Sequence, residues 1–322
     1  MYNIGIDVGG TNISGGIVDA GGKIIFKKAI PALPSRTSEI IVADIIALCK
    51  NLIEESAIPA CDIQSVGVGS PGMINPQSGT VVYAANINFV NVALADIMGA
   101  QLNCPVYIDN DANCAALGEG SFGAAKGSDN SVTITLGTGV GGGIIIGGSI
   151  YSGSFFGAGE IGHHVICMNG ELCSCGAKGC WEAYASASAL IRDTAIAARN
   201  NPESIINRLV NSNMDEITAK TAFDAASAGD NIAKAVVANY IDYLSIGLVN
   251  VINFLQPEVI VIGGGVSGQG SALISEIESR IGGFAASSGV KTRFVIAELG
   301  NDAGIIGAAQ LDNTRSQYEP LS

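Results

Sequence analysis

The chain contains the same short pattern twice: a strand-like segment, a glycine-rich turn, a second strand and a Gly-Gly turn. Residues 4–22 read IGIDVGGTNISGGIVDAGG, and residues 131–151 read SVTITLGTGVGGGIIIGGSIY. The first copy predicts strands at 2–8, 13–19 and 23–30, joined by tight turns into an antiparallel meander. Two such meanders, each opening one half of the chain, predict a duplicated domain whose glycine turns hold one nucleotide in a cleft.

The rest of the pattern predicts a mixed α/β protein. Apolar residues at Ile41, Ile45, Leu48 and Leu52 recur at helical spacing and predict a helix over 38–56. Further strands are expected at 65–69, 106–109, 259–262 and 293–297, and further helices near 182–199, 203–211, 216–228, 231–254, 271–281 and 303–311. A length of 322 residues favours two domains. We expect a small N-terminal domain over 1–112 plus about 301–322, and a larger one over 113–300 with an insertion at 160–182.

Charge argues against two classes of partner. The chain has 16 basic and 29 acidic residues, a net charge of −13. Such a balance disfavours nucleic acid or an anionic membrane as the main partner. The N-terminal residues MYNIGIDVGGTN show no secretory pattern, and polar residues interrupt the apolar stretch 232–262, so we expect a cytoplasmic protein without a transmembrane span.

Three cysteines and a histidine form the most specific local cluster. Cys173, Cys175 and Cys180 follow His163 in the segment GEIGHHVICMNGELCSCGAKGCWEAY. Three thiolates and an imidazole are the Cys3His set of a closed, structural zinc site. His164 is the rival imidazole. The alternative is a disulfide pair with a spare thiol, which a reducing cytosol disfavours.

Zinc at this cluster would also fix its neighbours. Glu160 and His163 come just before the cysteines and Glu182 just after them. Two carboxylates and an imidazole held in place predict a pocket for a small molecule.

The first glycine turn has the residues of a phosphate site. Asp7 ends a strand and is followed by Gly9, Gly10, Thr11 and Asn12. Glycines let the backbone approach a ligand closely, and the turn amides with the threonine hydroxyl can face phosphate oxygens. Asp7 is the expected holder of Mg²⁺ through water. Ordinary hairpin chemistry is the alternative for this turn.

Two further glycine turns spell G-x-G-x-x-G, the pattern of a dinucleotide site. After Gly137, Thr138 and Gly139 the sequence continues as a strand, whereas a dinucleotide fingerprint needs a helix there. After Gly263, Gly264 and Gly265 too little chain remains for the second half of a dinucleotide-binding sheet. We therefore expect the second turn to face a phosphate and the third to contact adenosine.

A polar run follows the strand that ends near Asp109. The residues Asp109-Asn110-Asp111-Ala112-Asn113 lie at the carboxyl end of this strand, where α/β proteins bind ligands. Carboxylates and amides suit a polyhydroxylated ligand, and Asp111 could accept the proton of an attacking hydroxyl, as phosphoryl transfer to an alcohol requires. Capping of the following helix is the alternative role.

Taken together, seven segments of the chain resemble the ROK family of sugar kinases, within the actin-like, sugar-kinase and Hsp70 superfamily. They are IDVGGTN, GVGSPGMINPQSG, DNDAN, LGTGVGGGIIIGG, GAGEIGHH, CSCGAKGCWE and IGGGVS. The resemblance implies a two-domain actin-like fold with a zinc-binding insertion at 160–182, ATP with Mg²⁺, and a homodimer or homotetramer.

The resemblance also implies roles for individual residues. Asp111 matches the catalytic base, with Asn110 beside it. Glu160, His163 and Glu182 match residues that hold the sugar, and Gly72 and Asn86 belong to loops of the same pocket. The zinc ligands of the family match His163, Cys173, Cys175 and Cys180. His163 would then serve both the metal and the sugar.

Within the family, the intact pocket residues most resemble those of bacterial glucokinases, so glucose phosphorylation at the 6-hydroxyl is the expected activity. N-acetylmannosamine, N-acetylglucosamine, mannose and fructose are alternative acceptors, and polyphosphate is an alternative donor. A sugar sensor without catalysis and a chaperone-type ATPase are rival functions. Repressors of the family carry a helix-turn-helix domain ahead of the first glycine turn. Here that turn begins at Gly9, which favours a kinase.

Overall fold

The computed structural model describes residues 1–33, 35–84, 87–282 and 290–313, and divides into two compact units. Unit 1 comprises residues 1–133, 143–159 and 297–322, and unit 2 comprises residues 134–142 and 160–296. The expected domain limits, 1–112 with about 301–322 and 113–300, stay a prediction.

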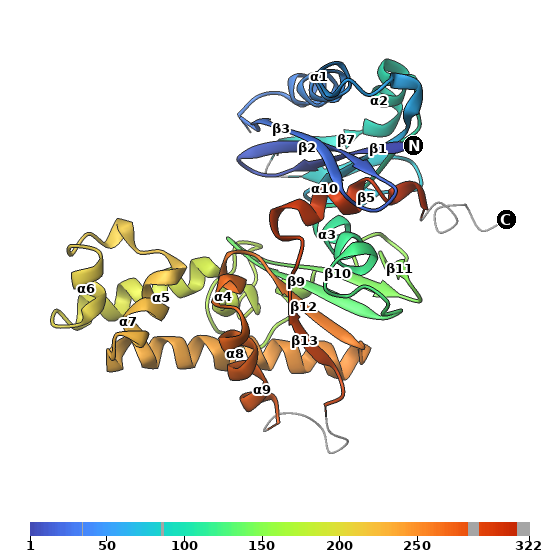
Figure 1. The fold of residues 1–322 in the computed structure, drawn as a ribbon. Helices are drawn as coiled ribbons and strands as arrows, with labels where there is room; N and C mark the ends of the chain where they lie inside the picture. The colour runs from blue at the N-terminus through green and yellow to red at the C-terminus, as the bar shows by residue number, and fades with distance from the viewer. Residues whose placement is uncertain (34, 85–86, 283–289, 314–322) are drawn as a thin grey trace. The chain divides into compact units, whose positions relative to one another are not determined.

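Unit 1 is built on a five-stranded sheet in the order β3-β2-β1-β4-β8 (Figure 1). Its strands are β1 (Tyr2–Val8), β2 (Asn12–Asp19), β3 (Ile24–Pro31), β4 (Ile63–Ser70) and β8 (Val106–Asn110). The first three form the expected antiparallel meander, and β4 and β8 continue it in parallel. A smaller antiparallel sheet consists of β5 (Met73–Asn75), β6 (Thr80–Ala84) and β7 (Phe89–Val92).

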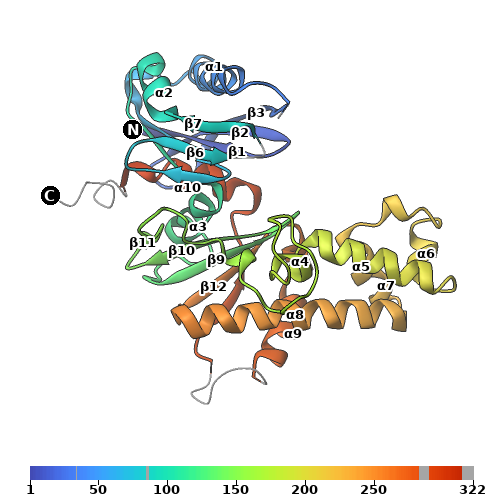
Figure 2. The same cartoon turned by 180° about the vertical axis from the view of Figure 1, so that it is seen from behind.

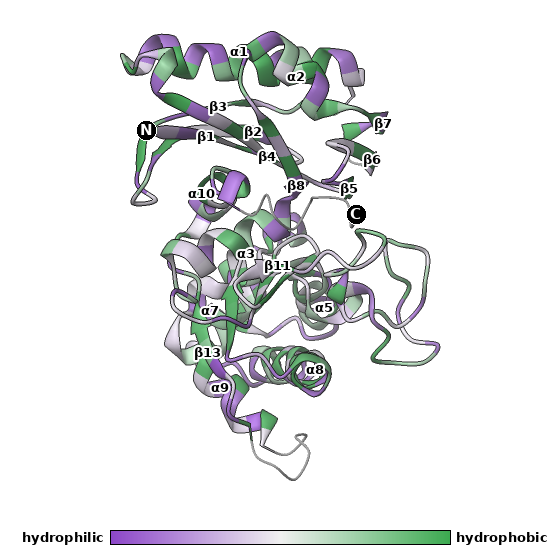
Figure 3. Cartoon of the chain, turned by 90° about the vertical axis from the view of Figure 1, so that its right-hand side faces the viewer, coloured by the Kyte–Doolittle hydropathy of each residue, from purple (hydrophilic) through white to green (hydrophobic). Residues whose placement is uncertain are grey.

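Helices cover both faces of the larger sheet of unit 1. The amphipathic helix α1 (Ser38–Ser56) and α2 (Leu94–Leu102) lie on one face (Figures 1 and 3). The predicted residues Ile41, Ile45, Leu48 and Leu52 of α1 are buried. The short helix α10 (Ala303–Ala308) lies on the other face. It approaches so closely that a Cβ on Gly5 of β1 would lie 1.8 Å from the Ile305 carbonyl oxygen. Gly5 therefore allows α10 to pack closely against β1.

The helix α3 (Asp111–Phe122) crosses α10 and carries a fully buried glutamate. The carboxylate of Glu119 accepts hydrogen bonds from the backbone N–H groups of Ala124 (2.8 Å), Glu298 (3.2 Å) and Leu299 (2.9 Å). A buried charge of this kind is tolerated because charge-assisted bonds replace water. Glu119 thus ties α3 to the segment that leads into α10.

A second five-stranded sheet repeats the strand order of the first. Its order is β11-β10-β9-β12-β13, and the division between the units falls within β9 and β10. The strands are β9 (Ser131–Leu136), β10 (Val140–Ile146), β11 (Ser149–Ile150), β12 (Val259–Gly263) and β13 (Arg293–Ile296). The meander β9-β10-β11 corresponds to β1-β2-β3, and β12 pairs in parallel with β13. The predicted duplication is therefore present in the strand order.

Unit 2 is rich in helices: α4 (Glu182–Ala185), α5 (Ala187–Asn200), α6 (Ile205–Leu209), α7 (Ala219–Ser227), α8 (Asn231–Leu255) and α9 (Ser271–Ile281). Helices α5, α7 and α8 pack against one another (Figure 2). The expected single helix over 182–199 is wrong, because Ser186 interrupts it and caps α5 by accepting from the Ala189 N–H at 3.1 Å. The remaining expected helices and strands agree with the structure within a few residues.

Helix α8 is also long and apolar enough to meet a length-and-composition test for a membrane span. Of the window that meets this test, 44% is buried within the protein, as in a core helix of a globular protein. Tyr240, Ile241, Leu244 and Leu248 are among the buried residues. The test therefore does not distinguish a span from a core helix here.

Candidate active site

The polar run after β8 caps helix α3. Asn110 accepts from the N–H groups of Ala112 (2.9 Å) and Asn113 (3.3 Å), as an N-cap side chain does. Its amide nitrogen donates to the Gly72 carbonyl at 3.2 Å, which draws the loop after β4 toward the cap. Asp111 is therefore the first residue of α3 and lies beside a fixed asparagine. Asn86, the other expected loop residue, lies outside the described residues.

Asp7 is half-buried and lies near a second carboxylate, that of Asp111. Burial, and then the charge of Asp111, raises the pKa of Asp7 to about 6, with Lys27 opposing the shift. Gly304 of α10 faces this carboxylate, since a Cβ there would be 2.8 Å from the Asp7 Cγ. Gly9, Gly10 and Thr11 follow as the turn between β1 and β2, and Asn12 is the first residue of β2. A carboxylate in this setting favours a cation as its partner.

The predicted metal ligands converge. His163, Cys173, Cys175 and Cys180 place one ligand atom each within 4.8 Å of one another. The Cys173 Sγ lies 3.6 Å from the His163 Nδ1, and the Cys175 Sγ lies 3.7 Å from the Cys180 Sγ. All eight cysteines are free thiols, so the disulfide alternative finds no support here. We call residues 160–182, which contain this cluster, the metal knot.

The two histidines of the knot point in different directions. His163 directs Nδ1 to the cluster, and its Nε2 lies 3.8 Å from the Glu160 Oε2. His164 instead directs Nδ1 to the Ile161 carbonyl, and its ring packs against Trp181 with centroids 5.3 Å apart. Burial lowers the pKa of His164. His163 is therefore the better ligand.

Glu182 connects the knot with the second glycine turn. One carboxylate oxygen, Oε2, accepts from the Val140 N–H at 3.0 Å, and the other, Oε1, accepts from the Ser174 hydroxyl at 2.7 Å. The turn is also tied to helix α5, since Ser188 donates to the Thr138 carbonyl at 2.8 Å. Gly137, Thr138 and Gly139 are therefore held by neighbours on two sides.

The third glycine turn follows β12 and leads into a 3-10 turn, η5 (Gly265–Gln269), before α9 begins. Gly264 has φ +81° and lies against the end of β9, where a Cβ would be 2.5 Å from the Leu136 carbonyl oxygen. Gln269, at the end of η5, borders a cavity of about 400 Å³ lined mainly by side chains of α7, α8 and α9. Its lining combines apolar side chains with the charged side chains of Lys234, Glu276 and Arg280.

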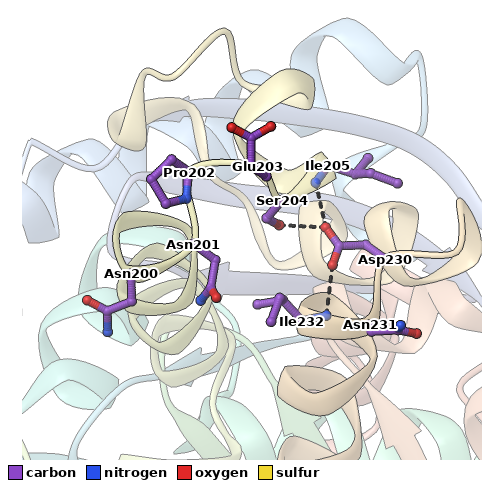
Figure 4. Close-up of a pocket in the computed structure, with 9 residues that line it drawn as sticks. All are labelled: Asn200, Asn201, Pro202, Glu203, Ser204, Ile205, Asp230, Asn231 and Ile232. Atoms are coloured by element: carbon purple, nitrogen blue, oxygen red, sulfur yellow. Dashed lines mark hydrogen bonds between the residues drawn. The ribbon is translucent and has the colours of Figure 1, made fainter.

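A second cavity, of about 470 Å³, lies at the start of α8 (Figure 4). Asp230 occupies its wall and accepts from the Ser204 hydroxyl at 2.5 Å and from the Ile232 N–H at 2.8 Å. Burial opposes ionisation, but these bonds lower the pKa of Asp230 overall. The carboxylate is a helix cap with its acceptors occupied, so this cavity has a structural explanation.

The sequence and the fold of this chain were compared with those of known proteins. Residues 3–315 match the ROK family profile. This chain is a member of the ROK family. It is 39% identical to a glucokinase of Halalkalibacterium halodurans over 96% of this chain and 94% of that protein. A ROK family glucokinase from Streptomyces griseus, solved in complex with glucose and AMPPNP, superposes with a TM-score of 0.83 at 36% identity, covering 97% of this chain and 99% of that one. The expected two-domain actin-like fold is thereby confirmed.

The ROK family also contains regulators. A xylose repressor of Caldicellulosiruptor bescii is 31% identical over 86% of this chain and 69% of its own length.

Sequence analysis assigned no role to three residues of this ROK protein, Ser174, Val140 and Glu119. Ser174 and Val140 lie inside the segments CSCGAKGCWE and LGTGVGGGIIIGG, but neither pattern predicts the contacts described above. Only Glu119 gave a signal, because it is an isolated charge in the small-residue helix segment ANCAALGEGSF. Ser174 and Val140 act through contacts that no local pattern reveals.

Proposed function

We propose that this ROK protein catalyses the ATP-dependent phosphorylation of a hexose at its 6-hydroxyl, with glucose as the acceptor. Near-full-length similarity to glucokinases supports the activity. The observation that carries the chemistry is the placement of Asp111 at the start of α3, beside the Asn110 cap. Phosphoryl transfer to an alcohol needs a proton acceptor at a fixed position, and this residue meets that requirement.

In this proposal Asp111 accepts the proton of the sugar 6-hydroxyl while the hydroxyl oxygen bonds to the γ-phosphorus and ADP leaves. Glu160, His163 and Glu182 hold other hydroxyls of the sugar, with Asn110 and the loop at Gly72. The amides of the turns at Gly9–Gly10 and Gly137–Gly139 face the phosphates, and Gly263–Gly265 contacts adenosine. Positioning of the two reactants would supply most of the rate.

Two metal ions fit the residues present. The carboxylate of Asp7, half-buried beside a glycine turn, suits Mg²⁺, which would neutralise phosphate charge when bound. Three thiols and one imidazole within 4.8 Å of one another suit Zn²⁺, because soft thiolate ligands select it. Zinc would have four protein ligands and no open position, so its contribution would be to hold the knot in shape.

A non-catalytic sugar sensor is the second candidate, because a xylose repressor shares 31% identity with this chain. A sensor would bind the sugar without releasing ADP. The remaining expectations concern assembly and location: a homodimer or homotetramer in the cytoplasm, without nucleic acid or membrane as a partner. The following experiment compares glucose with other hexoses as acceptors. The formation of hexose phosphate, measured with polyphosphate in place of ATP, compares the two donors.

The test is ADP release from ATP and Mg²⁺ without sugar and with glucose, mannose, fructose, N-acetylglucosamine or N-acetylmannosamine. We expect release that depends on glucose and falls by a factor of about 100 or more in Asp111→Asn, because the proton acceptor is lost. A parallel binding measurement shows whether the variant still binds glucose. Sugar binding without any sugar-dependent release in the wild type would instead identify a sensor.

A further inference from the structure

The carboxylate of Glu182 joins two segments that are distant in sequence. Its Oε2 accepts from Val140, the first residue of β10 after the second glycine turn, at 3.0 Å. Its Oε1 accepts from the hydroxyl of Ser174 at 2.7 Å. Ser174 lies between the two cluster residues Cys173 and Cys175. One side chain therefore links the metal knot to the turn.

The turn is shaped to admit this carboxylate. A Cβ on Gly139 would lie 2.3 Å from the Glu182 Oε2, so a larger residue there would displace it. The backbone beside Glu182 is fixed, because the fully buried Trp181 donates from its ring nitrogen to the Tyr243 carbonyl at 3.0 Å. The orientation of the carboxylate then depends on its own partners, Val140 and Ser174.

Ser174 is the closer of two partners that the knot offers to the Glu182 Oε1. Its hydroxyl donates at 2.7 Å, whereas the Cys173 Sγ lies 3.5 Å away. A thiol is a weak hydrogen-bond donor, so the serine hydroxyl makes the stronger of the two contacts.

We propose that Ser174 is a positioning residue: its hydroxyl orients the Glu182 carboxylate, and through it the metal knot orders the turn at Gly139–Val140. The effect on catalysis rests on the proposed function, in which Glu182 holds the sugar and the turn faces the phosphates. Loss of the hydroxyl leaves the metal ligands intact but frees the carboxylate to rotate. Both sugar binding and the order of the turn then weaken.

The experiment compares Ser174→Ala, Ser174→Thr and the control Ser279→Ala. The control removes a hydroxyl that donates only to the Glu276 carbonyl within its own helix, α9. For Ser174→Ala we expect unchanged zinc content, faster hydrogen–deuterium exchange in the peptide over 137–142, and a KM for glucose raised about 3- to 10-fold, the range for one lost hydrogen bond. We expect Ser174→Thr to restore both values, because threonine retains the hydroxyl, and Ser279→Ala to match the wild type.

A role that is merely structural would lower the melting temperature and the active fraction without changing KM or the exchange at 137–142. That result, or a Ser174→Thr variant that behaves like Ser174→Ala, would overturn the proposal. If the wild type releases no ADP with any sugar, the proposed function fails. In that case exchange at 137–142 in Ser174→Ala still decides whether the knot orders the turn.

Discussion

The two glycine turns follow equivalent strands of two sheets with the same strand order, yet each acquires its carboxylate differently. In unit 1 the acid is Asp7, a residue of the strand β1 itself. In unit 2 the equivalent strand β9 has no acidic residue, and Glu182 brings its carboxylate from the metal knot to the Val140 N–H. The strand order is shared, whereas the carboxylate beside each turn has a different origin: the strand itself in the first case and a packed neighbouring segment in the second.

Metal removal is the strongest test of this contrast. Structural zinc contributes on the order of 10 kcal/mol to folding in small domains, so its loss should disorder the knot and release Glu182. We expect a chelator to abolish sugar-dependent ADP release and to speed hydrogen–deuterium exchange at 160–182 and 137–142, with exchange at 7–12 unchanged.

Zinc analysis before and after chelation, and recovery on adding zinc back, provide the controls for this experiment. Full activity after verified zinc removal would contradict the role of the knot. If exchange speeds up equally at 7–12 and 137–142, the order of both turns depends on the metal knot to the same degree.

The sequence alone predicted those parts of the site that depend on short-range spacing. The thiols of Cys173, Cys175 and Cys180 come from a short motif, and they lie with the His163 ring within 4.8 Å of one another. The strands around both glycine turns were also predicted, because alternation and glycine punctuation are local signals.

Contacts between distant segments could not be predicted in this way. Glu119 accepts from Glu298 and Leu299, which are near it only after α10 has packed against α3. The link from Ser174 through Glu182 to Val140 depends on the fold of the knot in the same way. The expected helix over 182–199 runs through Ser186, because serine occurs inside helices as well as at N-caps and only the bond from the Ala189 N–H distinguishes the two.

Replacement of the acid of the first turn should stabilise the protein. A rise in the pKa of Asp7 from 3.8 to about 6 corresponds to an upper limit of about 3 kcal/mol at neutral pH. The ionised carboxylate is half-buried near Asp111, and asparagine removes that unfavourable charge. We expect Asp7→Asn to unfold at a higher temperature than the wild type at pH 7.5, and to lose activity.

The pH dependence gives the sign of this effect. Between about pH 4 and pH 6 folded Asp7 keeps a proton that the unfolded chain has released, so its contribution to stability falls as pH rises through this window. The advantage of Asp7→Asn over the wild type should therefore shrink as the pH is lowered toward 4. The exposed Asp62→Asn serves as the control and should show no such trend. A wild type more stable than Asp7→Asn at pH 7.5 would contradict the burial argument.

The smallest expected effect is a difference in stability between two glycine-to-alanine variants. It tests how freely the carboxylates of Asp7 and Glu182 can move. An added methyl on Gly304 would lie 2.8 Å from the Cγ of Asp7, at the base of its carboxylate, and one on Gly139 would lie 2.3 Å from the terminal Oε2 of Glu182. Asp7 has little room to move, so Gly304→Ala should destabilise the protein by about 1–3 kcal/mol, the usual range for overpacking. Glu182 has one more rotatable side-chain bond than Asp7, so its carboxylate can rotate away without a shift of the backbone.

Gly139→Ala should therefore cost less than about 1 kcal/mol in stability, the scale of one hydrogen bond, while separating Glu182 from the Val140 N–H. Thermal unfolding of the two variants, with exchange measured at 137–142, distinguishes these outcomes. A Gly139→Ala variant destabilised as strongly as Gly304→Ala would mean that Glu182 is as rigidly packed as Asp7. The carboxylate brought from the knot would then be as fixed as the one built into the strand, and the contrast between the turns would lie only in its origin.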